Sequence, residues 1–168
     1  YRREFPAEYI IQTMDEAGID KAIVHSIRLP PKESNDLTFR EVSKYPDRLI
    51  GFAHALPLPK TLEESITDLD RAVKDLGFKG VKIHFGEVGG GCPLELVSPI
   101  IEKAASLGVP CLIDSAGNIR LIEEIIEAHQ DAKIILAHLG NIEDERMIDR
   151  VIEMARVNRN VYVDTSYV

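Results

Sequence analysis

Short runs of apolar residues recur along the chain, and each run ends in polar residues or glycine. Such runs are typical of strands that are buried on both faces of a parallel sheet. Between them lie longer segments whose apolar residues repeat every three or four positions, which predicts amphipathic helices. The pattern predicts six strands, at Lys21–Ile27, Leu49–Leu56, Gly80–Phe85, Pro110–Ala116, Lys133–Leu139 and Val161–Ser166.

Helix signals fill the segments between these strands. Pro6–Ala17 begins with a proline and precedes a glycine, and the polar helix Asn35–Lys44 stops before another proline. Thr61-Leu-Glu-Glu64 has the spacing of a capping box. Ser98-Pro99 has the pattern of an N-cap followed by a first-turn proline, and Asn118 is expected to cap the following helix.

Predicted strands and helices alternate strictly, with strand starts 23 to 31 residues apart. This spacing is the length of one βα unit, and it fits either a (β/α)8 barrel or an open doubly wound sheet. No G-x-G-x-x-G follows a strand, so the dinucleotide-binding form of the open sheet loses support. Polar residues recur at strand ends, where a barrel gathers them at one mouth. We therefore predict a (β/α)8 TIM barrel with strand-end residues His25, His54, His84, Asp114, His138 and Asp164.

A complete barrel has eight strands and usually about 250 residues, whereas this sequence has 168 residues. We expect one domain over residues 1–168 that holds barrel strands two to seven, with strands one and eight outside the sequence. An open barrel of this kind would expose two hydrophobic edges. Unseen segments or partners would have to close the sheet.

The composition argues against two classes of partner. The formal net charge is −8 at pH 7, and no basic stripe of the kind that binds nucleic acid is visible. A negative surface repels anionic membranes, and no apolar run is long enough to span a bilayer. Cys92 and Cys111 have no framework spacing, which predicts reduced thiols in a cytoplasmic protein. The expected partner is a small-molecule substrate, with a homodimer left open.

Two strand ends carry the strongest candidates for chemistry. In Lys133–Asn141 (KIILAHLGN) the apolar run ends in His138, where an imidazole is well placed as a metal ligand or general base. The alternative is a histidine that is hydrogen-bonded to a loop carbonyl. Asp114 ends the preceding strand, and a carboxylate there needs a metal, a cation or amide donors. Its alternative role is to cap the turn Ser115–Asn118.

Lys82 and His84 have the same parity in GVKIHF, so both side chains are expected on one face of the strand. Lys82 has three candidate roles: a Schiff-base nucleophile, a carbamylated metal bridge, or a buried cation paired with Asp114. The ion pair is the simplest of these. Asp164, followed by Thr165 and Ser166, either binds substrate or ends its strand.

The remaining polar positions give weaker signals. His25 is interpreted as a core histidine, whereas His54 is nearer its strand end and closer to the expected mouth. His129 lies at a helix end and is expected to be solvated. The run Gly89–Gly91 has no Walker spacing, so a mobile lid is a better interpretation than a phosphate loop.

Four stretches, in this order and spacing, resemble the amidohydrolase-related (amidohydrolase 2) metal-dependent hydrolases. The similarity covers nearly the whole chain, and the ordered set is more specific than any single motif. The stretches are GFKGVKIH at 77–84, LGVP at 107–110 followed by CLIDSAGN, KIILAHLGN at 133–141 and VYVDTS at 161–166.

The resemblance implies a (β/α)8 barrel and a divalent metal, often zinc, with manganese as the alternative. His138 matches a strand-six histidine that binds metal or acts beside it as acid or base, and His84 matches a histidine on the substrate side. Asp114 stands where many members have a metal-binding histidine, which changes the charge and reach of the site. We assign His138 and Asp114 as metal-binding and catalytic, and His84, Lys82 and Asp164 as substrate-binding. The family's strand-one H-x-H pair and strand-eight aspartate have no counterpart here.

The predicted function is metal-dependent hydrolysis of an ester, lactone or amide of a small molecule. One alternative is a non-oxidative decarboxylase on the same fold. Another is a non-catalytic barrel that has lost metal ligands, and the aspartate at position 114 motivates it. A Schiff-base aldolase using Lys82 has less support from the rest of the pattern.

Overall fold

The computed structural model describes residues 6–140 and 145–166. Within these residues, helices and short strands alternate along the chain. The helices are α1 (Ala7–Ala17), α2 (Pro31–Val42), α3 (Leu62–Lys74), α4 (Leu94–Ser106), α5 (Ile119–Ala128) and α6 (Glu145–Val157). The strands are β1 (Ala22–Val24), β2 (Leu49–Gly51), β3 (Ala53–His54), β4 (Val81–His84), β5 (Cys111–Asp114), β6 (Ile134–Leu136) and β7 (Val161–Val163). A short 3-10 turn, η1 (Phe85–Val88), follows β4, and a tight turn with left-handed residues, η2 (Ala137–Gly140), follows β6.

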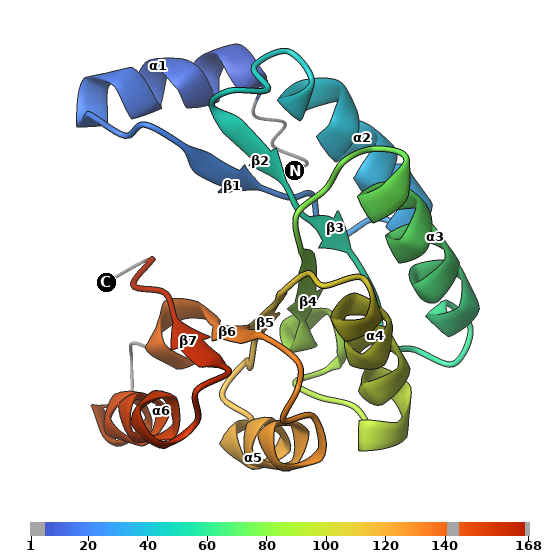
Figure 1. Ribbon diagram of the computed structural model, residues 1–168, viewed down its shortest axis with the longest axis vertical. Helices are drawn as coiled ribbons and strands as arrows, with labels where there is room; N and C mark the ends of the chain where they lie inside the picture. Colours follow the sequence, from blue (N-terminus) through green and yellow to red (C-terminus); the bar gives the residue numbers. More distant parts are fainter. Residues whose placement is uncertain (1–5, 141–144, 167–168) are drawn as a thin grey trace.

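All strand pairs are parallel, β1 with β2 and then β3 to β7 in sequence order. β2 and β3 are two parts of one predicted strand, and only Phe52 separates them. The Phe52 amide donates to the Val24 carbonyl at 2.9 Å, and the Ala53 amide donates to the Gly80 carbonyl at 2.8 Å. The chain therefore passes from pairing with β1 to pairing with β4. Figure 1 shows one curved arrangement of strands with β1 and β7 at its two edges.

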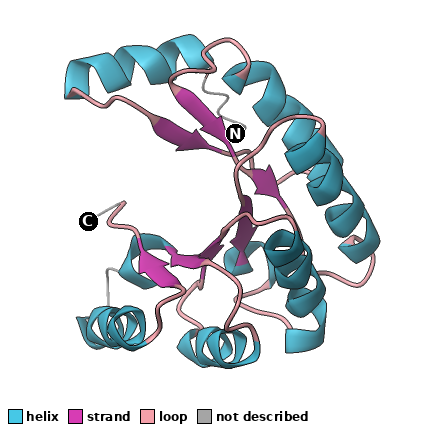
Figure 2. Ribbon diagram, in the orientation of Figure 1, coloured by secondary structure: helices cyan, strands magenta, loops and turns pink. Residues whose placement is uncertain are grey.

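The parallel α/β class is confirmed, and the strand order follows the sequence without reversing. A doubly wound sheet reverses its strand order at a switch point, so the observed order is barrel-like. Helices lie on the convex side and strands line the concave side (Figure 2). The closed eight-stranded barrel is not formed by the described residues, because the edge strands β1 and β7 do not pair with each other.

Alternating side chains give the sheet two different faces. The convex face carries Val81, Ile83 and Ile113, which are fully buried in the main hydrophobic core against the helices. The concave face carries a smaller apolar cluster, made of Phe52, Leu112 and Ala137 with Ile50 and Ile135 packed against it. Parallel pairing places registered residues on one face, so this cluster forms the floor beneath the polar strand ends.

Two glycines allow aromatic rings to lie directly on the strands. A Cβ atom at Gly51 would approach the Phe78 ring to 2.6 Å, and one at Gly80 would approach the Phe52 ring to 2.4 Å. Both rings are almost completely buried. These positions therefore have no room for a side chain, which explains the choice of glycine within the strand region.

Three local predictions need correction. The Thr61 side chain makes no N-cap hydrogen bond; its hydroxyl donates to the Leu56 carbonyl at 3.1 Å instead of closing a capping box. Helix α4 starts at Leu94, before Ser98-Pro99, so Pro99 lies inside the helix rather than in its first turn. The strand predicted over 133–139 ends at Leu136, and His138 follows in the turn η2. The predicted Asn118 cap is confirmed, since its side chain accepts from the Leu121 amide.

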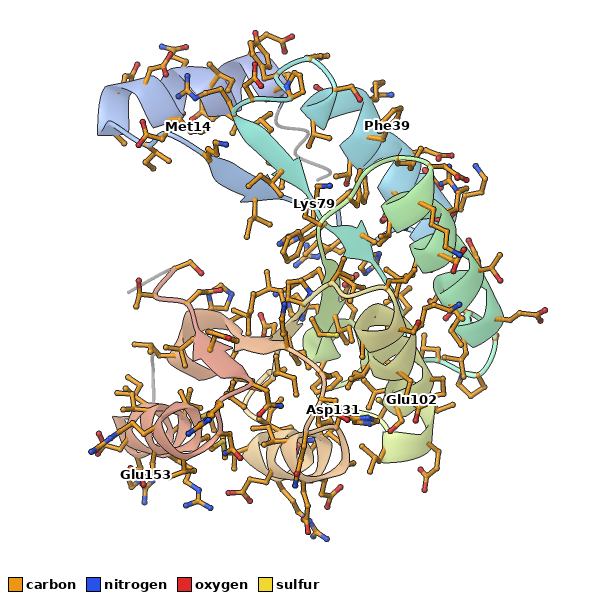
Figure 3. All side chains as sticks on the ribbon, in the orientation of Figure 1. Met14, Phe39, Lys79, Glu102, Asp131 and Glu153 are labelled. Atoms are coloured by element: carbon orange, nitrogen blue, oxygen red, sulfur yellow. The ribbon has the colours of Figure 1, made fainter. Side chains whose placement is uncertain are left out.

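The outer surface is charged, as expected of helices that pack one face on a sheet. Glu102 on α4 and Glu153 on α6 are exposed on this outer side (Figure 3). None of the helices in the described ranges is long and apolar enough to cross a membrane.

Candidate active site at the strand ends

Three of the predicted site residues meet where β4, β5 and β6 end. The register pairs His84 with Asp114 on adjacent parallel strands. Oδ2 of Asp114 lies 3.4 Å from Nε2 of His84 and 3.5 Å from Nε2 of His138. The three side chains are 16–27% exposed, so the cluster is shielded but reachable from solvent.

The two oxygens of Asp114 have separate roles. Oδ1 accepts a hydrogen bond from the Ala116 amide at 2.9 Å, which shapes the turn that follows β5. Ala116 itself has a φ of 47°, a left-handed conformation that is uncommon outside glycine. The turn-capping role considered from the sequence is therefore present. It leaves Oδ2 as the oxygen that faces the two histidines.

His84 presents an N–H group to this carboxylate. Its Nδ1 accepts a hydrogen bond from the Gly86 amide at 3.0 Å, so in the neutral ring the proton is on Nε2. A side chain at position 86 would prevent this contact, because a Cβ there would lie 2.7 Å from Cε1 of His84. The Nε2 proton of His84 points to Asp114 across 3.4 Å, an electrostatic contact that is longer than an ordinary hydrogen bond.

His138 has the opposite tautomer. Its Nδ1 lies 3.0 Å from the carbonyl oxygen of Ser166, and a carbonyl can only accept, so the proton is on Nδ1. In a neutral ring, Nε2 then directs its lone pair toward the Asp114 carboxylate. A lone pair and an anionic oxygen 3.5 Å apart repel each other unless a proton or another cation lies at that position.

Lys82 lies on the same concave face, paired in register with His54 on one side and Leu112 on the other. It is only 3% exposed. The predicted ion pair with Asp114 is not formed, and Lys82 makes no hydrogen bond or ion pair to any residue that the structure describes. Burial lowers the pKa of Lys82, although nearby Asp114, Asp164 and Glu87 act in the opposite direction.

Asp164 and Ser166 lie beside His138 and make their hydrogen bonds there. Oδ1 of Asp164 accepts from the His138 amide at 3.0 Å, from the Ser166 amide at 3.0 Å and from the Ser166 hydroxyl at 2.5 Å. Burial raises the pKa of Asp164, but these hydrogen bonds outweigh burial and hold it below the ordinary value.

The sequence did not single out Glu87, which lies in the turn η1 after β4. Its Oε2 contacts Nε2 of His54 at 2.9 Å, and its Oε1 accepts from the Arg28 amide at 2.6 Å. Nδ1 of His54 contacts the Ser34 hydroxyl at 3.1 Å. Ser34, His54 and Glu87 therefore have the order of a hydrolase triad, but Ser34 and His54 are fully buried. This group joins the ends of three elements, and its hydroxyl and imidazole are enclosed by protein.

Two other histidines also differ from expectation in detail. His25 was interpreted as a satisfied core residue, yet its buried Nδ1 has no hydrogen-bond partner among the residues that the structure describes. Burial, together with the positive charge of Lys82, lowers the pKa of His25 to about 4. His129, expected in solvent, instead contacts the Ser98 hydroxyl through Nε2 at 2.8 Å.

The donor types at the strand ends fit a divalent metal, but the number of donors does not complete a site. Imidazole nitrogen and carboxylate oxygen are the ligands that zinc and manganese accept. Nε2 of His138 and Oδ2 of Asp114 lie 3.5 Å apart and face each other, so a cation between them could contact both donors. Even so, no three His, Cys, Asp or Glu side chains within 6–140 and 145–166 are arranged to hold an ion. These residues therefore offer part of a metal site.

Similar folds occur in solved structures at low sequence identity. 4-Oxalomesaconate hydratase from Rhodopseudomonas palustris is 22% identical, with a TM-score of 0.72 over 94% of this chain and 58% of that one. 5-Carboxyvanillate decarboxylase from Novosphingobium aromaticivorans, complexed with manganese, is 23% identical, with a TM-score of 0.69 over 88% and 53%. 2,6-Dihydroxybenzoate decarboxylase from Rhizobium is 21% identical, with a TM-score of 0.63 over 78% and 55%.

These comparisons establish the kind of fold and the family, and they leave the reaction open. The chain spans just over half the length of each of these structures. The sequence matches no curated protein. The sequence profile of the amidohydrolase family matches residues 5–168, which confirms the resemblance seen in the four stretches. The chain belongs to the amidohydrolase family.

Proposed function

We propose that this chain provides part of the active site of a metal-dependent decarboxylase that acts on a small carboxylate. The observation that carries the proposal is Lys82, a buried cation that makes no hydrogen bond or ion pair to the described residues and lies on the concave face below His84, Asp114 and His138. A buried ammonium is costly unless an anion neutralises it. A substrate carboxylate would supply that anion, which makes Lys82 a substrate-binding residue.

Similar structures support this choice over hydrolysis. Two of those described above are decarboxylases, and their names, like that of the hydratase, specify carboxylic acids. One of them was solved with manganese. Because each is below 25% identical, the substrate and the reaction are proposals for this chain.

The site residues take separate roles in this proposal. His138 holds or delivers a proton at Nε2, and His84 donates its Nε2 proton toward the same region. A divalent metal, either manganese or zinc, would be held by His138 and Asp114 and would polarise a substrate oxygen when bound. Catalytic zinc sites commonly have three protein ligands, so further donors are needed beside these two. Lys82 binds the carboxylate that orients the substrate.

Hydrolysis of an ester, lactone or amide is the second candidate. Nε2 of His138 lies 3.5 Å from the Asp114 carboxylate in a partly exposed position, and an imidazole beside a carboxylate also suits a general base that activates water. Decarboxylation and hydrolysis give different products, so an assay can distinguish them.

The test uses the intact protein, purified without chelators, and measures metal content and product release. Metal-dependent release of carbon dioxide from 2,6-dihydroxybenzoate or a related carboxylate is expected, with loss in Lys82→Met and His138→Ala. Lys79→Met is the matched control, because Lys79 is exposed just before the same strand (Figure 3). Hydrolysis of a lactone or ester panel without release of carbon dioxide would establish the second candidate instead. Absence of bound metal would contradict both.

A further inference from the structure

The backbone at His138 has an unusual conformation for residues with side chains. His138 has a φ of 56° and Leu139 a φ of 49°, and both lie in the left-handed region. Two consecutive non-glycine residues in this region are rare, because Cβ crowds the following carbonyl oxygen. A conformation of this kind persists only when surrounding contacts determine it.

Asp164 supplies those contacts from the end of β7. Its side-chain Oδ1 accepts from the His138 amide, and its main-chain carbonyl accepts from the Leu139 amide, each at 3.0 Å. Its own amide donates to the Leu136 carbonyl at 3.0 Å. One residue therefore binds the backbone before, at and after the histidine.

Ser166 fixes the imidazole ring itself. Its carbonyl oxygen lies 3.0 Å from Nδ1 of His138, and its hydroxyl lies 2.9 Å from the same atom. The Ser166 hydroxyl donates to Asp164 at 2.5 Å, so at Nδ1 it can act only as an acceptor. Both oxygens of Ser166 thus require a proton on Nδ1.

We infer that Asp164 and Ser166 are positioning residues that hold His138 in one backbone conformation and one tautomer, with Nε2 directed to Asp114. This assigns Asp164 a role through His138, in place of the substrate contact expected from the sequence. The inference rests on the proposed role of Nε2 but not on which reaction follows. Partners of this kind commonly set the tautomer of a metal-binding histidine.

The test is the nitrogen NMR spectrum of the imidazoles in intact, metal-free protein labelled on histidine. The chain has five histidines, and His138→Gln identifies the signals of His138. The wild type is expected to show the proton on Nδ1. Asp164→Asn keeps an oxygen that accepts the same hydrogen bonds, so it retains this tautomer, whereas Asp164→Ala loses it and shows exchange between two tautomers. Asp75→Ala is the control, because Asp75 is exposed at the end of α3.

A second readout is zinc affinity, measured by competition with a chelator. Loss of an outer partner of a ligating histidine typically weakens metal binding about 10- to 100-fold, so Asp164→Ala is expected to fall in that range and Asp164→Asn to stay close to wild type. Where Asp164→Ala does not fold, the wild-type and Asp164→Asn spectra decide the question. A proton on Nε2 in wild type would overturn the inference. So would an Asp164→Asn protein that loses the Nδ1 proton, or an Asp164→Ala protein with an unchanged His138 spectrum.

Discussion

Replacing Lys82 with methionine is expected to stabilise the protein while removing its activity. Lys82 is 3% exposed and makes no hydrogen bond or ion pair to the described residues. Methionine has a similar length and carries no charge, and it can pack beside Leu112, the registered neighbour on β5. The substitution therefore removes a buried charge without creating a large cavity.

Two opposing contributions set how much Lys82→Met raises the free energy of unfolding. Burying a polar group without a partner costs about 1–3 kcal/mol in mutational data. Attraction to Asp114, Asp164 and Glu87 opposes that cost, but burial is the largest influence and the net pKa of Lys82 is lowered. We therefore expect Lys82→Met to raise the free energy of unfolding by about 1–3 kcal/mol. For a domain of this size, each kcal/mol raises Tm by about 2–4 °C.

The stability gained by Lys82→Met should decrease as pH rises, because burial lowers the pKa of Lys82. Because the pKa of Lys82 is lower in the folded state than the ordinary value of about 10.4, the unfolded chain binds more protons between those two pKa values. Wild-type stability therefore rises with pH across that window. The cost of burying charged Lys82 is complete below its pKa in the folded state, and it disappears as pH approaches about 10.4. The advantage of Lys82→Met should be largest at neutral pH and shrink toward alkaline pH.

Urea unfolding of both proteins at several pH values, followed by circular dichroism, measures this difference. Lys79→Met serves again as the control and should change stability by less than about 0.5 kcal/mol, as exposed substitutions usually do. A Lys82→Met protein that is less stable at neutral pH, or whose advantage grows with pH, would refute the reasoning. Either result would mean that the three carboxylates compensate Lys82 fully.

Three further changes test other parts of the structure. Arg28 is exposed with a φ of 65°, so Arg28→Gly should stabilise by about 1 kcal/mol in thermal unfolding; no gain would show that the side chain makes compensating contacts. Gly80→Ala should destabilise by about 1–3 kcal/mol, because its Cβ would meet the Phe52 ring at 2.4 Å, and Phe52→Leu should restore part of the loss. The lowered pKa of His25, about 4, means that the unfolded chain binds the proton more readily below about pH 6.5. Stability should therefore fall between pH 6.5 and 4, and His25→Phe should flatten that fall.

The strands and their shared polar ends could be predicted because their signals are local. Apolar runs and turn residues placed β4 and β5, and strand parity placed Lys82 and His84 on one face, which the register confirms. The approach of His84 to Asp114 then followed from parallel pairing, whereas His138 reaches Asp114 from the turn η2. The lack of an ion pair between Lys82 and Asp114 did not follow, because it depends on how far the side chains reach across the concave face.

The conformation around His138 could not be predicted for a different reason. Its left-handed turn depends on Asp164, which lies 26 residues away in sequence, and nothing in the run IILAHLGN distinguishes the turn from a longer strand. The tautomers of His84 and His138 depend likewise on the amide of Gly86 and the carbonyl of Ser166. A pattern of residue types does not show which main-chain groups will lie beside these two imidazole rings.

The tethered oxygen of Asp114 has a consequence for the metal-binding role proposed for this residue. A free carboxylate can bind an ion through either oxygen or through both, whereas Asp114 keeps Oδ1 on the Ala116 amide. This hydrogen bond fixes the direction of the other oxygen, Oδ2, much as a ring fixes the direction of an imidazole nitrogen. If Asp114 takes the place of a histidine ligand, as the sequence resemblance implies, it would offer a donor of fixed direction and lower the charge of the site by one. The exchange would alter the electrophilicity of a bound metal rather than the shape of its site.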